Sequence, residues 1–180
     1  MPLVRQATIT VVLGSSNREG NTKRLVDRVF IGDEASMFNL GDYSFSDWDY
    51  DAQNLEDDFQ VLASKLTRST DIVFATPVYW YAMSAQMKRF FDRFSDLITR
   101  RKALGRSLAG KRTWLLATGS DPELPTGFTV PFQRTSEYFH MKFCGALYTQ
   151  MNDSDFKIDI ISQIENFRTK IISSSILSDQ

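Results

Sequence analysis

Cysteine is nearly absent from this chain of 180 residues, which contains only Cys144. A single thiol excludes an internal disulfide, and it excludes iron–sulfur clusters and zinc sites held by several cysteines. Long apolar runs are absent too, since none reaches the roughly 18 residues that a membrane span requires. The chain must therefore fold around an apolar core, for which its length and its 42% of hydrophobic residues suffice.

An excess of charge of either sign is also missing. The chain has 21 Lys and Arg residues against 22 Asp and Glu residues, which gives a net charge of -1. This balance argues against a dedicated nucleic-acid binder and is equally unlike a strongly acidic carrier. The apolar run at residues 9–13 is too short, and too interrupted by polar residues, for a signal peptide. We therefore expect a cytoplasmic protein that binds neither nucleic acid nor membranes.

Hydrophobic patterning predicts strands that alternate with helices. Short apolar runs bounded by turn residues predict five strands, at residues 7–13, 37–40, 71–75, 112–118 and 143–149. Apolar residues at helical spacing predict five helices, at residues 22–30, 55–66, 83–100, 128–139 and 156–172. Such an alternation calls for parallel βαβ units with right-handed crossovers. The predicted fold is therefore one α/β domain over residues 1–180, with a doubly wound sheet that helices cover on both faces.

Ligands of doubly wound sheets bind beyond the carboxyl ends of the strands. The loops after the first, third and fourth predicted strands should meet at that edge. The first of these loops, residues 14–22, contains two glycines and several hydroxyl and amide side chains around the start of a helix. Helix N-termini favour anions, and Arg18, Asn21 or Thr22 could add hydrogen bonds to a phosphate.

Neither of two common nucleotide fingerprints is present in the first loop. The lysine of the Walker motif is missing, and so is the dinucleotide motif G-x-G-x-x-G. A phosphate monoester such as riboflavin phosphate fits the hydroxyl-rich loop better. The alternative is an ordinary helix start with Asn21 as its N-cap.

The second loop, residues 76–84, contains three consecutive aromatic residues at the end of a predicted strand. Pro77 stiffens the turn, and the backbone amides that follow it could reach the edge of a flat heterocycle whose face an aromatic ring borders. The alternative is that these rings are buried beneath the next helix. Burial of one or two of them is expected, and burial of all three is not.

Residues 14–22 and 76–88 together resemble the NAD(P)H-dependent FMN reductase family of the flavodoxin-like superfamily. The resemblance is to the branch that contains iron–sulfur flavoproteins and related quinone and flavin reductases. It implies a flavodoxin-like three-layer sandwich whose five-stranded parallel sheet has the order 2-1-3-4-5. It also implies that FMN is bound with its phosphate in the first loop and its isoalloxazine ring against the second.

The same resemblance implies which residues bind the cofactor. The phosphate end would be held by five residues of the first loop, Ser15, Asn17, Arg18, Asn21 and Thr22. The ring would be bordered by five residues of the second loop, Pro77, Val78, Tyr79, Trp80 and Tyr81. Gly119 and Ser120, in the loop after the fourth strand, would approach the flavin from the other side. A plain turn closed by Asp121 and Pro122 is the alternative for this third loop.

The activity implied by the resemblance is that of an FMN-dependent NAD(P)H oxidoreductase. Hydride would pass from NAD(P)H through bound FMN to a quinone, a flavin or a similar small acceptor in a ping-pong cycle. A homodimer or homotetramer is expected on the same ground. The main alternative is a flavodoxin-type electron carrier that binds FMN without NAD(P)H turnover of its own, which the near-neutral charge disfavours. A binding module without a cofactor is a further alternative, which the two loops oppose.

The segment at residues 41–51 departs from the iron–sulfur branch, because it lacks the cysteines that would hold a cluster. A cluster is therefore excluded. The aromatic residues of the segment, Trp48 and Tyr50, have two interpretations of equal weight. They could line the flavin pocket, or they could anchor a polar loop.

Two further patterns have more than one interpretation. Residues 88–112 are strongly basic, which indicates a solvated helix end matched to the helix dipole. The alternatives are a dimer surface held by ion pairs and a site for the 2′-phosphate of NADPH. His140 and Cys144 are too few ligands for a metal site, so a partly buried structural role is expected for them.

Overall fold

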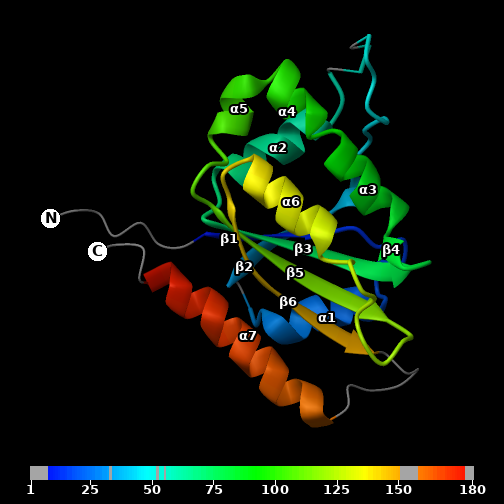
Figure 1. Ribbon diagram of the computed structural model, residues 1–180, viewed down its shortest axis with the longest axis vertical. Helices are drawn as coiled ribbons and strands as arrows, with labels where there is room; N and C mark the ends of the chain where they lie inside the picture. Colours follow the sequence, from blue (N-terminus) through cyan, green and yellow to red (C-terminus); the bar gives the residue numbers. More distant parts are fainter. Residues whose placement is uncertain (1–7, 33, 52, 55, 151–157, 177–180) are drawn as a thin grey trace, which may run out of the picture.

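A parallel sheet forms the middle layer of the computed structural model, which describes residues 8–32, 34–51, 53–54, 56–150 and 158–176 (Figure 1). Five of its strands within these residues run parallel: β1 (Ile9–Leu13), β2 (Ala35–Asn39), β3 (Asp71–Tyr79), β5 (Arg112–Gly119) and β6 (Lys142–Gln150). Their order is β2-β1-β3-β5-β6, and the short β4 (Ala82–Met83) pairs only with β3, antiparallel. With β4 set aside, this is the predicted order 2-1-3-4-5.

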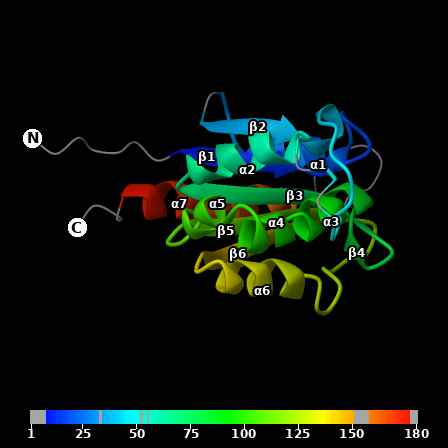
Figure 2. The same ribbon diagram turned by 90° about the horizontal axis from the view of Figure 1, so that it is seen from above.

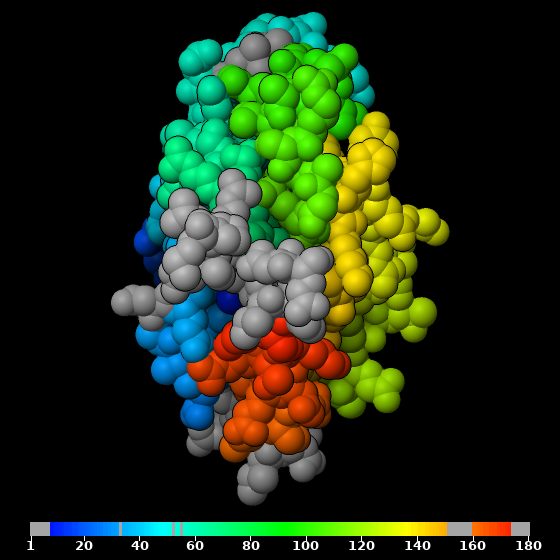
Figure 3. Space-filling model, turned by 90° about the vertical axis from the view of Figure 1, so that its left-hand side faces the viewer, coloured from blue at the N-terminus to red at the C-terminus, as the bar shows by residue number. Residues whose placement is uncertain are grey.

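Helices cover both faces of the sheet, as predicted (Figure 2). One face carries α1 (Asn21–Val29) and α7 (Ile158–Ile176). The other face carries α2 (Phe59–Thr67), α3 (Ala85–Asp92), α4 (Ser95–Thr99), α5 (Lys102–Arg106) and α6 (Val130–Tyr138). A 3-10 turn, η1 (Leu40–Asp42), follows β2. Figure 3 faces the side away from the strand arrowheads, with α7 at one end and the green helices α4 and α5 at the other.

Two apolar cores form because successive side chains of a strand point to opposite faces of the sheet. Val11 is packed in the core under α1 and α7, and its neighbour Val12 is packed in the core under α2, α3 and α6. The second core is rich in phenylalanine. Phe59, Phe90 and Phe94 form edge-on or tilted ring contacts, with centroids 5.3–6.4 Å apart. This packing holds α3 against the sheet beside the second loop.

The prediction of one continuous helix at residues 83–100 is wrong. The structure has a break between α3 and α4, where the amides of Phe94, Asp96 and Leu97 donate to carbonyls three residues back. Arg93 lies at the break with its side chain buried. The apolar stripe continues across it, since Phe94 and Leu97 are both buried. Buried side chains therefore continue to recur at helical spacing across the break, although the backbone hydrogen bonds of the α-helix are interrupted there.

The third strand was predicted to stop before Pro77, and this too is wrong, since β3 continues to Tyr79. The pairing of β1 with β3 ends at Ala75, whereas the pairing of β5 with β3 continues to Pro77. Proline is tolerated where a strand has no neighbour on one side. The remaining strands and helices begin and end close to their predicted residues. Three parts of these predictions lie outside the described residues: Ala7 of the first strand, Leu55 of the second helix and residues 156–157 of the last helix.

Candidate functional site

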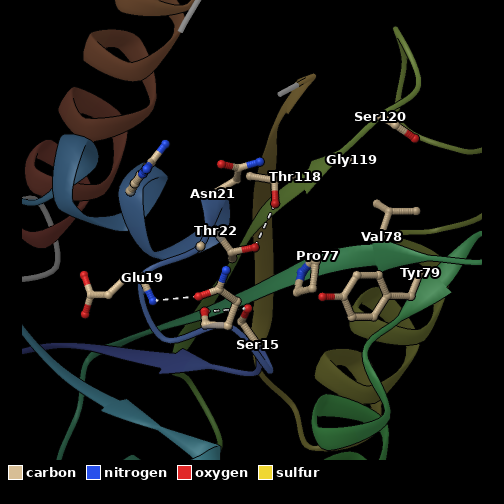
Figure 4. A pocket seen from close by; sticks show the side chains of 13 residues that line it. Ser15, Glu19, Asn21, Thr22, Pro77, Val78, Tyr79, Thr118, Gly119 and Ser120 are labelled. Atoms are coloured by element: carbon tan, nitrogen blue, oxygen red, sulfur yellow. Dashed lines mark hydrogen bonds between the residues drawn. The ribbon is translucent and has the colours of Figure 1, made fainter. Parts of the chain in front are cut away.

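A cavity of about 520 Å³ lies beyond the carboxyl ends of β1, β3 and β5 (Figure 4). This volume is within the range of about 300–1,000 Å³ that is usual for ligand pockets. The three predicted loops supply its wall. The lining residues are Ser15, Asn17, Glu19, Gly20, Asn21, Thr22, Arg24, Pro77, Val78, Tyr79, Thr118, Gly119 and Ser120.

The first turn of α1 forms one side of the cavity. Gly20 is the N-cap residue and Asn21 the first helical residue, so the alternative with Asn21 as N-cap is wrong. Within the described residues no side chain caps this helix, and its first turn contains no acidic residue. An uncapped helix start offers backbone N–H groups and a partial positive charge to an anion.

Internal hydrogen bonds hold the first loop in shape. The Ser15 hydroxyl donates to the Asn17 carbonyl at 3.1 Å, and the Asn17 side-chain oxygen accepts from the Glu19 amide at 3.1 Å. The Gly20 amide also donates to the Asn17 carbonyl. A Cβ atom on Gly20 would lie 3.0 Å from the Asn17 Cβ atom. A larger residue at position 20 would therefore push the loop away from the helix start.

Buried hydrogen bonds connect the three loops to one another. The hydroxyls of Thr22 and Thr118 are 2.7 Å apart and link the first loop to the third. The Ser84 hydroxyl donates to the Gly14 carbonyl at 2.6 Å, and the Ser84 amide donates to the Thr76 hydroxyl at 3.0 Å. Ser84 also caps α3 by accepting from the Met87 amide. The three loops at this edge of the sheet are therefore joined to one another by hydrogen bonds.

Arg18 does not lie in the cavity wall, although it was predicted at the phosphate end. It forms an ion pair with Asp42 of η1. Arg24 lines the cavity instead, and sequence reasoning missed it. The signal was available, because Arg24 lies four residues after Gly20 and such spacing puts two residues on one face of a helix. Glu19 and Thr118 are further lining residues that the sequence did not single out.

The second loop divides at Tyr79. Pro77, Val78 and Tyr79 line the cavity, whereas Trp80 and Tyr81 do not. Trp80 is 93% exposed and Tyr81 is 70% exposed, so burial beneath the next helix is wrong for both. They form the two-residue turn between β3 and β4, with φ angles of 48° and 64°. Asn-Gly is the usual pair at two such positions, so two aromatic residues strain the backbone there.

The third loop completes the wall with Thr118, Gly119 and Ser120. Gly119 has no space for a side chain, since a Cβ atom there would lie 2.7 Å from the Tyr148 hydroxyl oxygen. The loop is thus more than a turn closed by Asp121 and Pro122, because it closes one side of the cavity.

The segment at residues 41–51 contacts other parts of the molecule than the cavity. Trp48 packs against Tyr50 with ring centroids 4.2 Å apart, and the Arg100 guanidinium lies 5.1 Å from the Trp48 ring. Arg100 also donates to the carbonyls of Asp49 and Tyr50. Neither aromatic residue is among those that line the cavity. The geometry favours an anchoring role over a place in the flavin pocket.

The basic segment anchors this acidic region, a role that sequence reasoning missed. Arg93 is buried and donates to Asp96 at 2.9 Å and to both carboxylate oxygens of Asp57. Arg89 donates to Asp47 at 2.8 Å. Burial acts to raise the pKa of Asp57, but hydrogen bonds from Arg93 and from backbone amides outweigh it and hold that pKa below its usual value. Several of the charges thus bind loop 41–58 to α3 and α4.

Metal binding has no support among the described residues, where no group of three or more His, Cys, Asp or Glu side chains is placed to hold an ion. His140 is exposed, with a φ of 55°, so its predicted partial burial is wrong. Cys144 is half-buried, and this burial raises the pKa of its thiol. The described helices include none that is both long and apolar enough to cross a membrane.

The fold and this site define a class of α/β protein with a ligand cavity at the switch point of a doubly wound sheet. A sequence model of the family described as NADPH-dependent FMN reductase matches residues 7–124 of the chain. The chain belongs to this family of oxidoreductases.

Known proteins resemble the chain over most of its length. "Putative NAD(P)H-dependent FMN-containing oxidoreductase YwqN" of Bacillus subtilis is 25% identical over 154 residues, which cover 80% of this chain and 85% of that protein. The solved structure of a Trp repressor binding protein from Bacillus subtilis covers 88% of this chain and 96% of its own, with 22% identity and a TM-score of 0.73. The solved structure of a flavodoxin, WrbA-like protein from Agrobacterium tumefaciens covers 94% of this chain and 97% of its own, with 17% identity and a TM-score of 0.67. These structures confirm the flavodoxin-like fold.

Proposed function

We propose that this chain binds FMN in the cavity at the carboxyl ends of β1, β3 and β5 and catalyses NAD(P)H-dependent reduction of a small acceptor by a ping-pong cycle. The observation that carries the proposal is the meeting of three loops around the uncapped first turn of α1. The chemistry that bound FMN would supply is the acceptance of hydride from NAD(P)H and the transfer of two electrons to the acceptor. The chain itself supplies the binding groups and their orientation.

The phosphate end of the cavity fits a dianion. Backbone N–H groups of the first turn of α1 are available there, and within the described residues the Asn17 side-chain nitrogen has no hydrogen-bond partner. The Arg24 side chain lines the same wall. Ser15 uses its hydroxyl hydrogen within the loop, so its role is to hold Asn17 in place. Arg24 therefore replaces Arg18 as the cation that we assign to the phosphate.

The other end of the cavity fits a flat ring. Pro77, Val78 and Tyr79 border one side, and Gly119 and Ser120 border the other. The backbone of Val78 and Tyr79 extends beyond the residues of β3 that pair with β1, and there it pairs with β4. Backbone amide groups in the wall of a pocket can hydrogen-bond to ring carbonyls and stabilise negative charge that develops on them. No side chain has to act as a nucleophile.

Comparisons support the cofactor and the reductant. The names of the family and of YwqN both include FMN and NADPH or NAD(P)H. An FMN-dependent NADH-azoreductase from Bacillus anthracis, solved in complex with FMN, has the same fold, with 9% identity, 92% coverage of this chain, 100% of that chain and a TM-score of 0.66. We assign the activity to one domain over residues 1–180, and we propose a cytoplasmic homodimer or homotetramer.

One experiment separates the reductase from the carrier. The purified protein is loaded with FMN, freed of excess flavin and mixed without oxygen with NADH or NADPH while the absorbance of the bound flavin is followed. Rapid bleaching with either nucleotide is the expected result. Bound flavin that stays oxidised with both nucleotides would establish the carrier, and failure to retain FMN would overturn the proposal as a whole.

A further inference from the structure

The edge strand β6 contacts the third loop, which forms one wall of the cavity. None of its residues lines the cavity, yet two of its side chains donate hydrogen bonds to the third loop. The Tyr148 hydroxyl donates to the Asp121 carbonyl at 2.6 Å, and the Gln150 side-chain nitrogen donates to the Ser120 carbonyl at 2.8 Å. Because they are two residues apart on one strand, both side chains leave the same face of the sheet.

The Tyr148 ring also fills the space behind Gly119. A Cβ atom on Gly119 would lie 2.7 Å from the Tyr148 hydroxyl oxygen and 3.2 Å from its ring. The ring packs against the core under α2, α3 and α6, which fixes its position independently of the cavity. The third loop therefore rests on a side chain that is anchored in the core of the domain.

We propose that Tyr148 is a positioning residue that holds the third loop as a wall of the FMN site, with Gln150 as a second attachment. This inference rests on the proposed function. Ser120 and Asp121 are exposed, so the loop has little packing of its own to fix its carbonyls. A displaced third loop would widen the cavity on the side of Gly119 and lower the affinity for a flat ring.

The phenol can do this over the whole physiological pH range. Burial, and secondarily the charge of Asp121, raise the pKa of Tyr148 above its ordinary value. The hydroxyl therefore remains protonated and continues to donate to the Asp121 carbonyl.

The variant Tyr148→Phe tests the role of the hydroxyl, since it keeps the ring that packs in the core. We expect the dissociation constant for FMN, measured by quenching of flavin fluorescence on titration into apoprotein, to rise about three- to tenfold. We also expect hydrogen exchange of the amides at residues 119–121 to become faster in the apoprotein, where FMN has no influence. The control is Tyr138→Phe on α6, which removes the hydroxyl of a 64% exposed tyrosine and should change neither quantity.

A double-mutant cycle tests the contact between the ring and the wall. Gly119→Ala alone should weaken FMN binding, because its Cβ atom meets the Tyr148 hydroxyl. Adding Tyr148→Phe removes the atom that lies 2.7 Å away, so the double variant should bind FMN more tightly than Gly119→Ala alone. A structural defect alone would make the two losses add.

Failure of the inference and failure of the proposed function look different. If wild-type protein binds FMN, and Tyr148→Phe binds it equally well with unchanged exchange at residues 119–121, Tyr148 does not position the loop and the proposed function stands. If wild-type apoprotein binds no FMN, the proposed function is wrong and this inference with it.

Discussion

Thr22 and Thr118 share a buried hydrogen bond in the lining of the cavity, with their hydroxyl oxygens 2.7 Å apart. One residue belongs to the first turn of α1 and the other to the end of β5. The bond therefore fixes the distance between the first turn of α1 and the third loop on the other side of the cavity.

Replacing one of these threonines should destabilise the fold. Thr118→Val leaves the Thr22 hydroxyl buried without its partner, which we expect to lower the free energy of unfolding by about 1–3 kcal/mol. Urea unfolding of the apoprotein measures this change. The double variant Thr22→Val with Thr118→Val should recover part of the loss, because no hydroxyl is then left unpaired. Losses that simply add would show that the pair is not coupled.

Arg24 and Arg18 form a matched pair for testing the phosphate end. Arg24→Gln should raise the dissociation constant for FMN roughly tenfold, since a charge-assisted contact to phosphate is lost. Its affinity for riboflavin, which lacks the phosphate, should not change. Arg18→Gln should leave FMN affinity almost unaffected, because Arg18 pairs with Asp42 outside the cavity wall. A larger effect at Arg18 than at Arg24 would reverse our assignment.

The turn formed by Trp80 and Tyr81 should make the fold less stable than a turn with the residues usual at positive φ angles would. Replacing Trp80 by Asn and Tyr81 by Gly supplies the residues that positive φ angles favour, so we expect a gain of about 1–2 kcal/mol in unfolding free energy. Both rings are mostly exposed, and little packing is lost with them. Thermal unfolding of the apoprotein measures the gain. A lower melting temperature would mean that the rings stabilise the fold through contacts that outweigh the strain.

Acid should weaken the attachment of loop 41–58. The pKa of Asp57 is held below its ordinary value of 3.8, mainly by Arg93 against the opposing effect of burial. Its contribution to stability is therefore complete above the pKa of the unfolded chain and is lost as pH falls through the lower pKa of the folded state. Asp57→Asn should reduce the dependence of unfolding free energy on pH in this acidic range, and urea unfolding between neutral pH and pH 3 would measure it. A wild-type slope in the variant would exclude Asp57 as a source.

Arg93 should be more important than any surface cation in the same segment. Arg93→Met leaves the carboxylates of Asp57 and Asp96 without their buried partner, and breaking such a pair typically lowers stability by about 3–5 kcal/mol. Lys88→Met, which breaks an exposed pair with Asp92, should change stability by less than about 1 kcal/mol. Similar losses in the two variants would contradict the buried network.

The fold could be predicted from the sequence because burial periodicity determines both element type and layer. Residues 11–13 and 72–75 are continuous apolar runs, which are typical of strands covered on both faces. The break at Arg93 could not be predicted, since the apolar stripe continues across it and the partner Asp57 lies far away in the sequence. Local pattern contains no information on such a distant ion pair.

The site was predicted better in position than in detail. The three loops meet as expected, because parallel strands place their carboxyl ends on one edge. The direction of Arg18 could not be predicted, since it depends on Asp42 beyond the next strand. The exposed turn at Trp80 was missed because aromatic residues usually indicate burial, and nothing local predicted the strand β4 that turns the chain back.

The unequal lengths of β1 and β3 have a consequence for the depth of the cavity. Pairing of these strands ends at Leu13 and Ala75, while β3 continues to Tyr79, so the sheet ends in a step instead of a straight margin. Beyond the step, Val78 and Tyr79 pair with β4, so a short hairpin continues the sheet where β1 has ended. Pro77, Val78 and Tyr79 line the cavity at this point, so substitutions at these three positions would change its depth, whereas substitutions in the part of β3 that pairs with β1 would not.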